Sequence, residues 1–120
     1  MRESVIEKLD IYPRCFDFSK AVVNLSKEVD LVMIYRPMMM QLVKAATSIS
    51  ANMMEASESE SRKDFVGKLS IALKETKETL YWLRLLQETG LIGDKSNVLF
   101  TECGEIVKIL ASIKRKVSAS

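Results

Sequence analysis

The chain has 120 residues, of which 48% are hydrophobic, so it is long enough to form one domain with a substantial core. Its 18 basic and 16 acidic side chains leave a net charge of +2, which is too small to require a nucleic-acid or membrane partner. Two cysteines without paired spacing and the lack of histidine argue against a zinc site. We therefore expect residues 1–120 to form a single domain that holds no metal and no cofactor.

Four segments have apolar side chains at the three- and four-residue spacings of an amphipathic helix, and none shows the alternation of a strand. The first predicted helix covers about residues 16–35 and follows a short flexible segment of about residues 1–14. The second covers about residues 37–56. Pro37 separates the two, because proline disfavours helical geometry at the residue before it and suits the first turn of a new helix.

The third predicted helix starts near Ser61, where SRKD is similar to a capping box. The Ser61 hydroxyl can accept a hydrogen bond from the amide of Asp64, and the Asp64 carboxylate can reach back. Gly90 ends this helix as a left-handed cap. The fourth helix starts near Asp94 or Ser96 and has apolar residues in alternating steps of four and three. Because the connections are short, we predict an all-α, antiparallel up-down-up-down four-helix bundle.

Three polar residues of the second predicted helix lie beside its apolar stripe. Ser48, Asn52 and Glu55 have the i, i+4, i+7 spacing of one helix face. One interpretation is a polar pocket or an RNA contact. We favour the other, a hydrogen-bonded seam that fixes the turn and the packing register, because buried polar groups must be paired. In that seam Glu55 would accept from the start of the third helix or pair with a basic residue.

Catalytic chemistry has little support in the sequence. Glu75 and Glu78 have the spacing of a carboxylate pair, but di-iron bundles also use histidine, which this chain lacks. Cys15 and Cys103 have no histidine as a base, and no glycine-rich phosphate loop is present. We expect no catalytic residues and no enzymatic activity. The start of the chain lacks the apolar core of a signal peptide, which together with two free thiols predicts a soluble cytoplasmic protein.

Charged residues are unevenly distributed along the chain. Residues 55–64 include four acidic and two basic side chains, whereas residues 108–116 include four basic and no acidic ones. In an up-down-up-down bundle both segments lie at the same pole. The basic side chains could neutralise the acidic turn, or they could form a rim that binds nucleic-acid phosphates. The candidate residues for such binding are Arg62, Lys63, Lys114, Arg115 and Lys116.

The third predicted helix is apolar over a wide arc, which we interpret as burial on more than one side. Tyr81 and Trp82 lie on this helix. Such aromatic side chains can stack on bases, but on a helix they more often anchor a core or a subunit interface. The arc therefore predicts self-association, with Tyr81 and Trp82 as candidate interface residues. Expected partners are further copies of the chain and RNA or DNA, but no membrane.

Residues 41–86 resemble the signature of a four-helix-bundle family that is named for intervening sequences in large-subunit ribosomal RNA genes and has also carried a ribosomal-protein label. The matching residues are Gln41, Leu42, Lys44, Ala45, Ser48, Ile49, Asn52, Glu55, Ser61, Asp64, Phe65, Leu69, Ile71 and Ala72. The family has no established enzymatic activity. Its relatives include the accessory protein of diversity-generating retroelements, a basic pentameric barrel that works with a reverse transcriptase and nucleic acid.

The resemblance implies a homopentamer that binds nucleic acid, or a nucleic-acid enzyme, through backbone electrostatics. Two positions depart from the family pattern. Many members have glycine after the motif glutamate and arginine three positions later, where this chain has Ala56 and Ser59. The missing arginine removes one phosphate contact. A structural or protein-interaction scaffold without nucleic-acid affinity therefore stays open as the alternative function.

Overall fold

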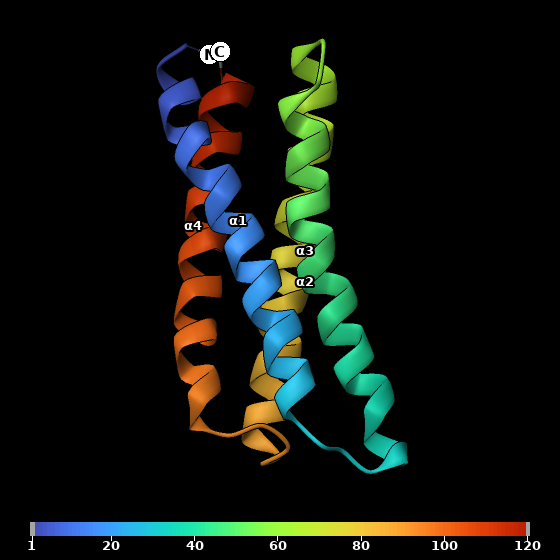
Figure 1. The fold of residues 1–120 in the computed structure, drawn as a ribbon. Helices are drawn as coiled ribbons and strands as arrows, with labels where there is room; N and C mark the ends of the chain where they lie inside the picture. The colour runs from blue at the N-terminus through green and yellow to red at the C-terminus, as the bar shows by residue number, and fades with distance from the viewer. Residues whose placement is uncertain (1, 120) are drawn as a thin grey trace.

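Four antiparallel helices make up the computed structural model, which describes the backbone of residues 2–119 and the side chains of residues 10–119. The elements are α1 (Arg2–Glu28), η1 (Met33–Tyr35), α2 (Arg36–Ser57), α3 (Arg62–Glu88), η2 (Asp94–Ser96) and α4 (Asn97–Ala119). Successive helices run in opposite directions (Figure 1), and the described backbone contains no strand. The predicted all-α, up-down-up-down four-helix bundle is confirmed.

The bundle is elongated, with extents of 48, 21 and 20 Å. Each helix packs against its neighbours in the chain, and α1 also contacts α4, which closes the bundle. One continuous apolar core runs through it. Its largest fully buried side chains include Ile11, Leu42, Ile49, Met53, Leu69, Leu83, Leu86, Ile106, Leu110 and Ile113. The stripes predicted for the second, third and fourth helices therefore do face the core.

The first helix differs from the sequence prediction at both ends. Instead of residues 16–35, α1 spans Arg2–Glu28, and the chain continues through a short link into η1. Val32 fitted the helical spacing of the sequence, but its backbone is extended and its side chain is 63% exposed. The wrong end point therefore comes from apolar residues that have helical spacing but face solvent.

Pro13 lies inside α1, where proline removes one backbone hydrogen bond and disfavours the helix. Ile11 and Cys15 nevertheless continue the buried stripe of Phe18 toward the start of the chain. Burial of these side chains outweighs the cost of the proline, so the prediction of a helix starting near residue 16 is wrong. Side chains at the very start lie outside the described residues, and the flexibility expected for residues 1–14 stays a prediction.

The end of α3 has the left-handed glycine that the sequence predicted. Gly90 has φ +77°, and its amide donates to the carbonyl oxygen of Gln87 at 3.0 Å. The amide of Leu91 donates to the carbonyl oxygen of Leu86 at 2.9 Å. These two bonds form a Schellman motif, which satisfies carbonyl groups that the helix end would otherwise leave unpaired.

Candidate functional site

The turn between α2 and α3 lies at the same end of the bundle as the carboxyl end of α4 (Figure 1). This arrangement brings the candidate nucleic-acid residues to one end, in agreement with the predicted topology. We call the set the basic pole; it consists of Arg62, Lys63, Lys114, Arg115 and Lys116. Lys114 is half-buried, and the other four side chains are exposed.

Most cations of the basic pole are not neutralised by direct contact. Among the described residues, Arg62, Lys63, Lys114 and Arg115 have no carboxylate within ion-pair distance. The glutamates of the α2–α3 turn form no ion pair with them either. Four cations are therefore available to an external anion, although nearby carboxylates lower the local positive potential.

The helix dipole favours cations in one half of the basic pole and disfavours them in the other. Cations near the carboxyl end of a helix are stabilised by the dipole, which suits the last turns of α4. Arg62 and Lys63 instead occupy the first turn of α3, where the dipole favours acidic side chains. Helix stability does not account for these two residues, whereas binding of an anion would.

The start of α3 is capped as the sequence predicted. Ser61 has extended backbone angles, and its hydroxyl oxygen accepts a hydrogen bond from the amide of Asp64 at 3.1 Å. No return bond from the Asp64 carboxylate is found within the described residues. The carboxylate still lies in the first turn, where the helix dipole favours it. These two residues fix where α3 begins and hence where Arg62 and Lys63 lie.

The polar face of α2 divides into one interhelical contact and two local ones. Glu55 Oε1 accepts from Lys68 Nζ at 2.6 Å, which links α2 to α3 as the favoured interpretation expected. Asn52 Nδ2 donates to the carbonyl oxygen of Ser48 at 2.8 Å, and Ser48 Oγ donates to that of Lys44 at 2.8 Å. Ser48 and Asn52 therefore bond to their own helix, and the seam predicted from all three residues reduces to the Glu55–Lys68 pair.

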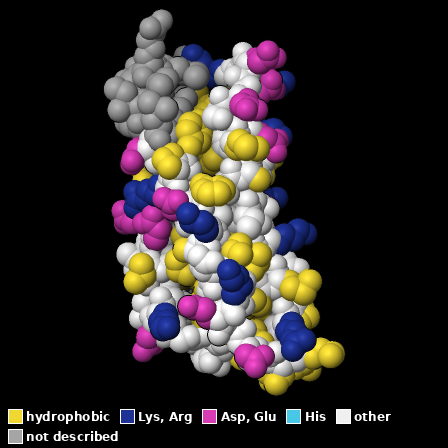
Figure 2. Space-filling model, viewed as in Figure 1, with side chains coloured by type: hydrophobic (Ala, Val, Ile, Leu, Met, Phe, Trp, Pro, Cys, Tyr) yellow, Lys and Arg dark blue, Asp and Glu magenta, His cyan; other side chains and the backbone are white. Residues whose placement is uncertain are grey.

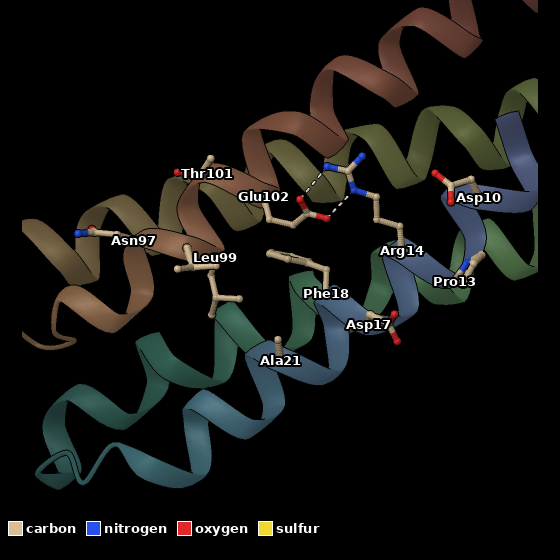
Figure 3. A pocket seen from close by; sticks show the side chains of 11 residues that line it. Asp10, Pro13, Arg14, Asp17, Phe18, Ala21, Asn97, Leu99, Thr101 and Glu102 are labelled. Carbon is tan, nitrogen blue, oxygen red and sulfur yellow. Dashed lines mark hydrogen bonds and ion pairs between the residues drawn. The ribbon is translucent and has the colours of Figure 1, made fainter.

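Figure 3 shows a pocket between α1 and α4 that the sequence did not indicate. It has a volume of about 800 Å³, and Phe18 and Leu99 are among its apolar lining residues. Arg14 Nε and Nη2 donate to the two carboxylate oxygens of Glu102 at 2.6 and 2.7 Å. These hydrogen bonds raise the pKa of Arg14. Because each group already has its partner, the pair acts as a link between the helices rather than as an acid or a base.

Both cysteines are buried in the core, and their thiols are unreactive at neutral pH. Burial raises the pKa of the Cys15 and Cys103 thiols to about 12. The Cys103 thiol also donates to the carbonyl oxygen of Thr76, with 3.3 Å between sulfur and oxygen. At neutral pH both sulfurs are protonated, and a protonated thiol is a poor nucleophile.

Most apolar side chains of the wide arc on α3 are buried or half-buried within the bundle. Its leucines are buried or half-buried, and Trp82 packs against the core while its Nε1 donates to Glu78 Oε2 at 3.4 Å. Tyr81 is 56% exposed, with its ring edge-to-face with that of Trp82. Ile71 is also exposed. Of the two interface candidates, Tyr81 is thus accessible and Trp82 mainly contributes to the core.

The described residues contain neither a group placed to hold a metal ion nor a helix able to cross a membrane. No group of three histidine, cysteine, aspartate or glutamate side chains among them is placed to hold a metal ion. In the same part of the chain, no helix combines the length and the apolar character needed to cross a membrane.

Comparison with known proteins gives the family. A sequence model of the 23S rRNA-intervening sequence proteins matches residues 7–112. The chain belongs to this family. A crystal structure of a protein with unknown function from the S23 ribosomal protein family of Bacteroides thetaiotaomicron is 38% identical, with a TM-score of 0.81 over 90% of this chain and 97% of that one. A search of curated proteins finds no match. Membership of the 23S rRNA-intervening sequence family confirms the resemblance and does not itself assign a function.

Proposed function

We propose that this member of the 23S rRNA-intervening sequence family is a non-enzymatic, self-associating module that binds nucleic-acid phosphates at its basic pole. The observation that carries the proposal is the position of Arg62 and Lys63. They are exposed and free of carboxylate partners among the described residues, and the dipole of their own helix opposes them. Bound phosphate would offset that unfavourable arrangement.

The charges nearby set the expected strength and selectivity of binding. The net charge is only +2, and Glu58 and Glu60 lie in the adjacent turn. Ser59 occupies the position at which many family members have arginine. Binding should therefore be weak, independent of base sequence and sensitive to salt, because it depends on releasing counterions from phosphates. A ring of subunits would raise the avidity by presenting several basic poles together.

A fluorescence-anisotropy titration tests the proposed binding. A short RNA and a short DNA duplex, each labelled with fluorescein, should bind at low salt and be released at physiological salt. Base sequence should make little difference, since phosphates provide the contacts. If neither probe binds at low salt, the nucleic-acid part of the proposal is wrong and the scaffold function remains.

Light scattering tests the proposed self-association. The purified protein at micromolar concentration should have a mass several times the 13.6 kDa of one chain, and a fivefold mass would match the expected homopentamer. Because Tyr81 is exposed, Tyr81→Ala should reduce the mass without lowering the melting temperature if it anchors the interface. Trp82→Ala, which removes a core contact, should lower the melting temperature. A monomeric wild-type protein would contradict the ring.

The alternative function, a protein-interaction scaffold, is favoured by a different observation. The two hairpins of the bundle are unlike each other, because exposed apolar side chains are concentrated on the first one, formed by α1 and α2. A scaffold function requires such a surface and needs no basic pole. The nucleic-acid titration separates the two functions directly.

A further inference from the structure

Exposed apolar side chains are concentrated on α1, α2 and the connection between them. Among residues 10–119, ten large hydrophobic side chains are exposed, and seven of them belong to α1, α2 and their connection. We call this set the α1–α2 face; it consists of Phe16, Val32, Met33, Ile34, Tyr35, Met40 and Met54. Figure 2, which views this side, shows hydrophobic side chains scattered from its upper part to its lower right corner, over the α1–α2 connection. A concentration of exposed apolar side chains on one part of a surface is typical of a binding site.

The α1–α2 face is hollowed rather than flat. One hollow, of about 580 Å³, is lined by Tyr12, Phe16 and Met54 together with other side chains of α1 and α2. A second, of about 660 Å³, is lined by Met40 and Val43 among others. Met40 and Met54 are about 21 Å apart along the axis of α2, at 1.5 Å per residue. Two apolar hollows in series between antiparallel helices suit the apolar stripe of another helix.

Methionine makes this surface adaptable. Four of the seven methionines of the chain, Met33, Met38, Met39 and Met40, fall within eight residues at the start of α2 and in η1. Met33 is 77% exposed and Met40 is 68% exposed. Unbranched, polarizable thioether side chains can repack around partners of different shape, which is typical of helix-binding grooves.

The lining of the second hollow carries two cations and one carboxylate, whereas the lining of the first hollow is uncharged. Arg36 and Lys44 line the second hollow one turn on either side of Met40, and within the described residues neither has a carboxylate at ion-pair distance. Lys20 lies 5.8 Å from the ring centre of Phe16, beside the first hollow, but Asp17 already pairs with it at 3.8 Å. The acidic side chain among the lining residues is Asp30. A partner that fills the hollows would gain by placing carboxylates opposite Arg36 and Lys44.

We propose that the α1–α2 face binds an acidic amphipathic helix of a different protein. Two copies of this face would bring like charges together, which disfavours a twofold contact between chains. The remaining exposed large hydrophobic side chains among the described residues, Ile71, Tyr81 and Val98, are divided between α3 and α4 and form no matching stripe. The occupant therefore has apolar residues at intervals of three and four on one side, flanked by aspartate or glutamate. This inference does not depend on the basic pole. It gives the protein a second partner, another protein, at a different surface.

A labelled synthetic helix tests the inference. The probe is a fluorescein-labelled peptide of about 18 residues, long enough to span both hollows at 1.5 Å per residue, with leucine on one side and glutamate flanking it. Its control has lysine in place of every glutamate. The acidic peptide should bind the full-length protein at least about tenfold more tightly than the basic one. Equal affinity, or preference for the basic peptide, would overturn the proposal.

Two matched variants locate the binding. Met40→Glu puts a carboxylate into the second hollow and should weaken binding of the acidic peptide at least tenfold. Val98→Glu, at a similarly exposed position on α4, should leave peptide binding unchanged. The nucleic-acid titration should be the same for both variants, which separates this inference from the proposed function. Unchanged peptide binding by Met40→Glu would overturn the proposal. A lower assembly mass of Met40→Glu would also overturn it, because the face would then bind a second copy of the chain. Tighter binding to phosphatidylserine vesicles than to the peptide would overturn it as well, because the face would then bind a membrane surface.

Discussion

Leu69→Ala should lower the free energy of unfolding by about 2–5 kcal/mol, because it leaves a cavity in the core. Leu69 has no exposed surface and belongs to the continuous core, to which α3 contributes between α2 and α4. Single domains are stable by only about 5–15 kcal/mol, so the loss would be a large share of the total. Urea denaturation followed by circular dichroism measures it.

Ile71→Ala is the matched control on the same helix. Ile71 is 40% exposed and lies on the outer side of α3, so its truncation should change the free energy of unfolding by less than about 1 kcal/mol. If both variants lost the same stability, the burial of α3 in the assembled protein would differ from that in the single bundle. A self-associating surface over Ile71 would produce such a result, and the mass of the two variants by light scattering would then identify it.

Local signals in the sequence were sufficient for most of the fold. Ser61 and Gly90 mark the two ends of α3 through bonds between residues only a few positions apart, so their roles follow from sequence spacing alone. The apolar stripes of the second, third and fourth helices were also predicted. α1 was misplaced because local rules conflict there: Pro13 argues against a helix that long-range burial of Ile11 and Cys15 nevertheless stabilises.

Contacts between distant residues were not predictable from the sequence. The Arg14–Glu102 pair joins residues 88 positions apart, and its existence depends on the register between α1 and α4. The α1–α2 face was missed for a related reason. The sequence showed the wide arc of α3 but not that other helices cover most of it, nor that Phe16 and Met54 stay uncovered. Exposure is a property of the packed bundle, whereas helical spacing only identifies which residues share a side.

The position of the basic pole, in contrast, followed from topology. An up-down-up-down order places the α2–α3 turn and the end of α4 at the same pole whatever the details of packing. Only the structure shows which of these charges form ion pairs. Glu55 forms an ion pair with Lys68, while Arg62 and Lys63 have no carboxylate partner among the described residues. The structure thus singles out the start of α3 within a charge pattern that the sequence left ambiguous.

Replacing Lys114, Arg115 and Lys116 together by alanine should weaken nucleic-acid binding at low salt by about tenfold or more and flatten its salt dependence. Each phosphate contact contributes about 0.9 to the slope of log affinity against log salt for duplex DNA, so loss of the contacts available to Lys114 and Arg115 would reduce the slope by up to about 2. Lys74, Lys77 and Lys95 are exposed and without ion pairs in the described part of the chain, and they lie away from the basic pole. Their triple alanine variant removes the same charge and should change the slope much less.

The double variant Arg62→Ala and Lys63→Ala separates binding from helix stability. Loss of Lys116 from the last turn of α4 also removes a favourable interaction with the helix dipole, about 0.3–1 kcal/mol, so the triple variant should melt at a slightly lower temperature. In the first turn of α3 the dipole opposes cations, so removing Arg62 and Lys63 should leave the melting temperature unchanged or raise it. Nucleic-acid affinity should nevertheless fall. A double variant that binds as tightly as the wild type would show that Arg62 and Lys63 do not contact phosphates, which would contradict the observation on which the proposed function rests.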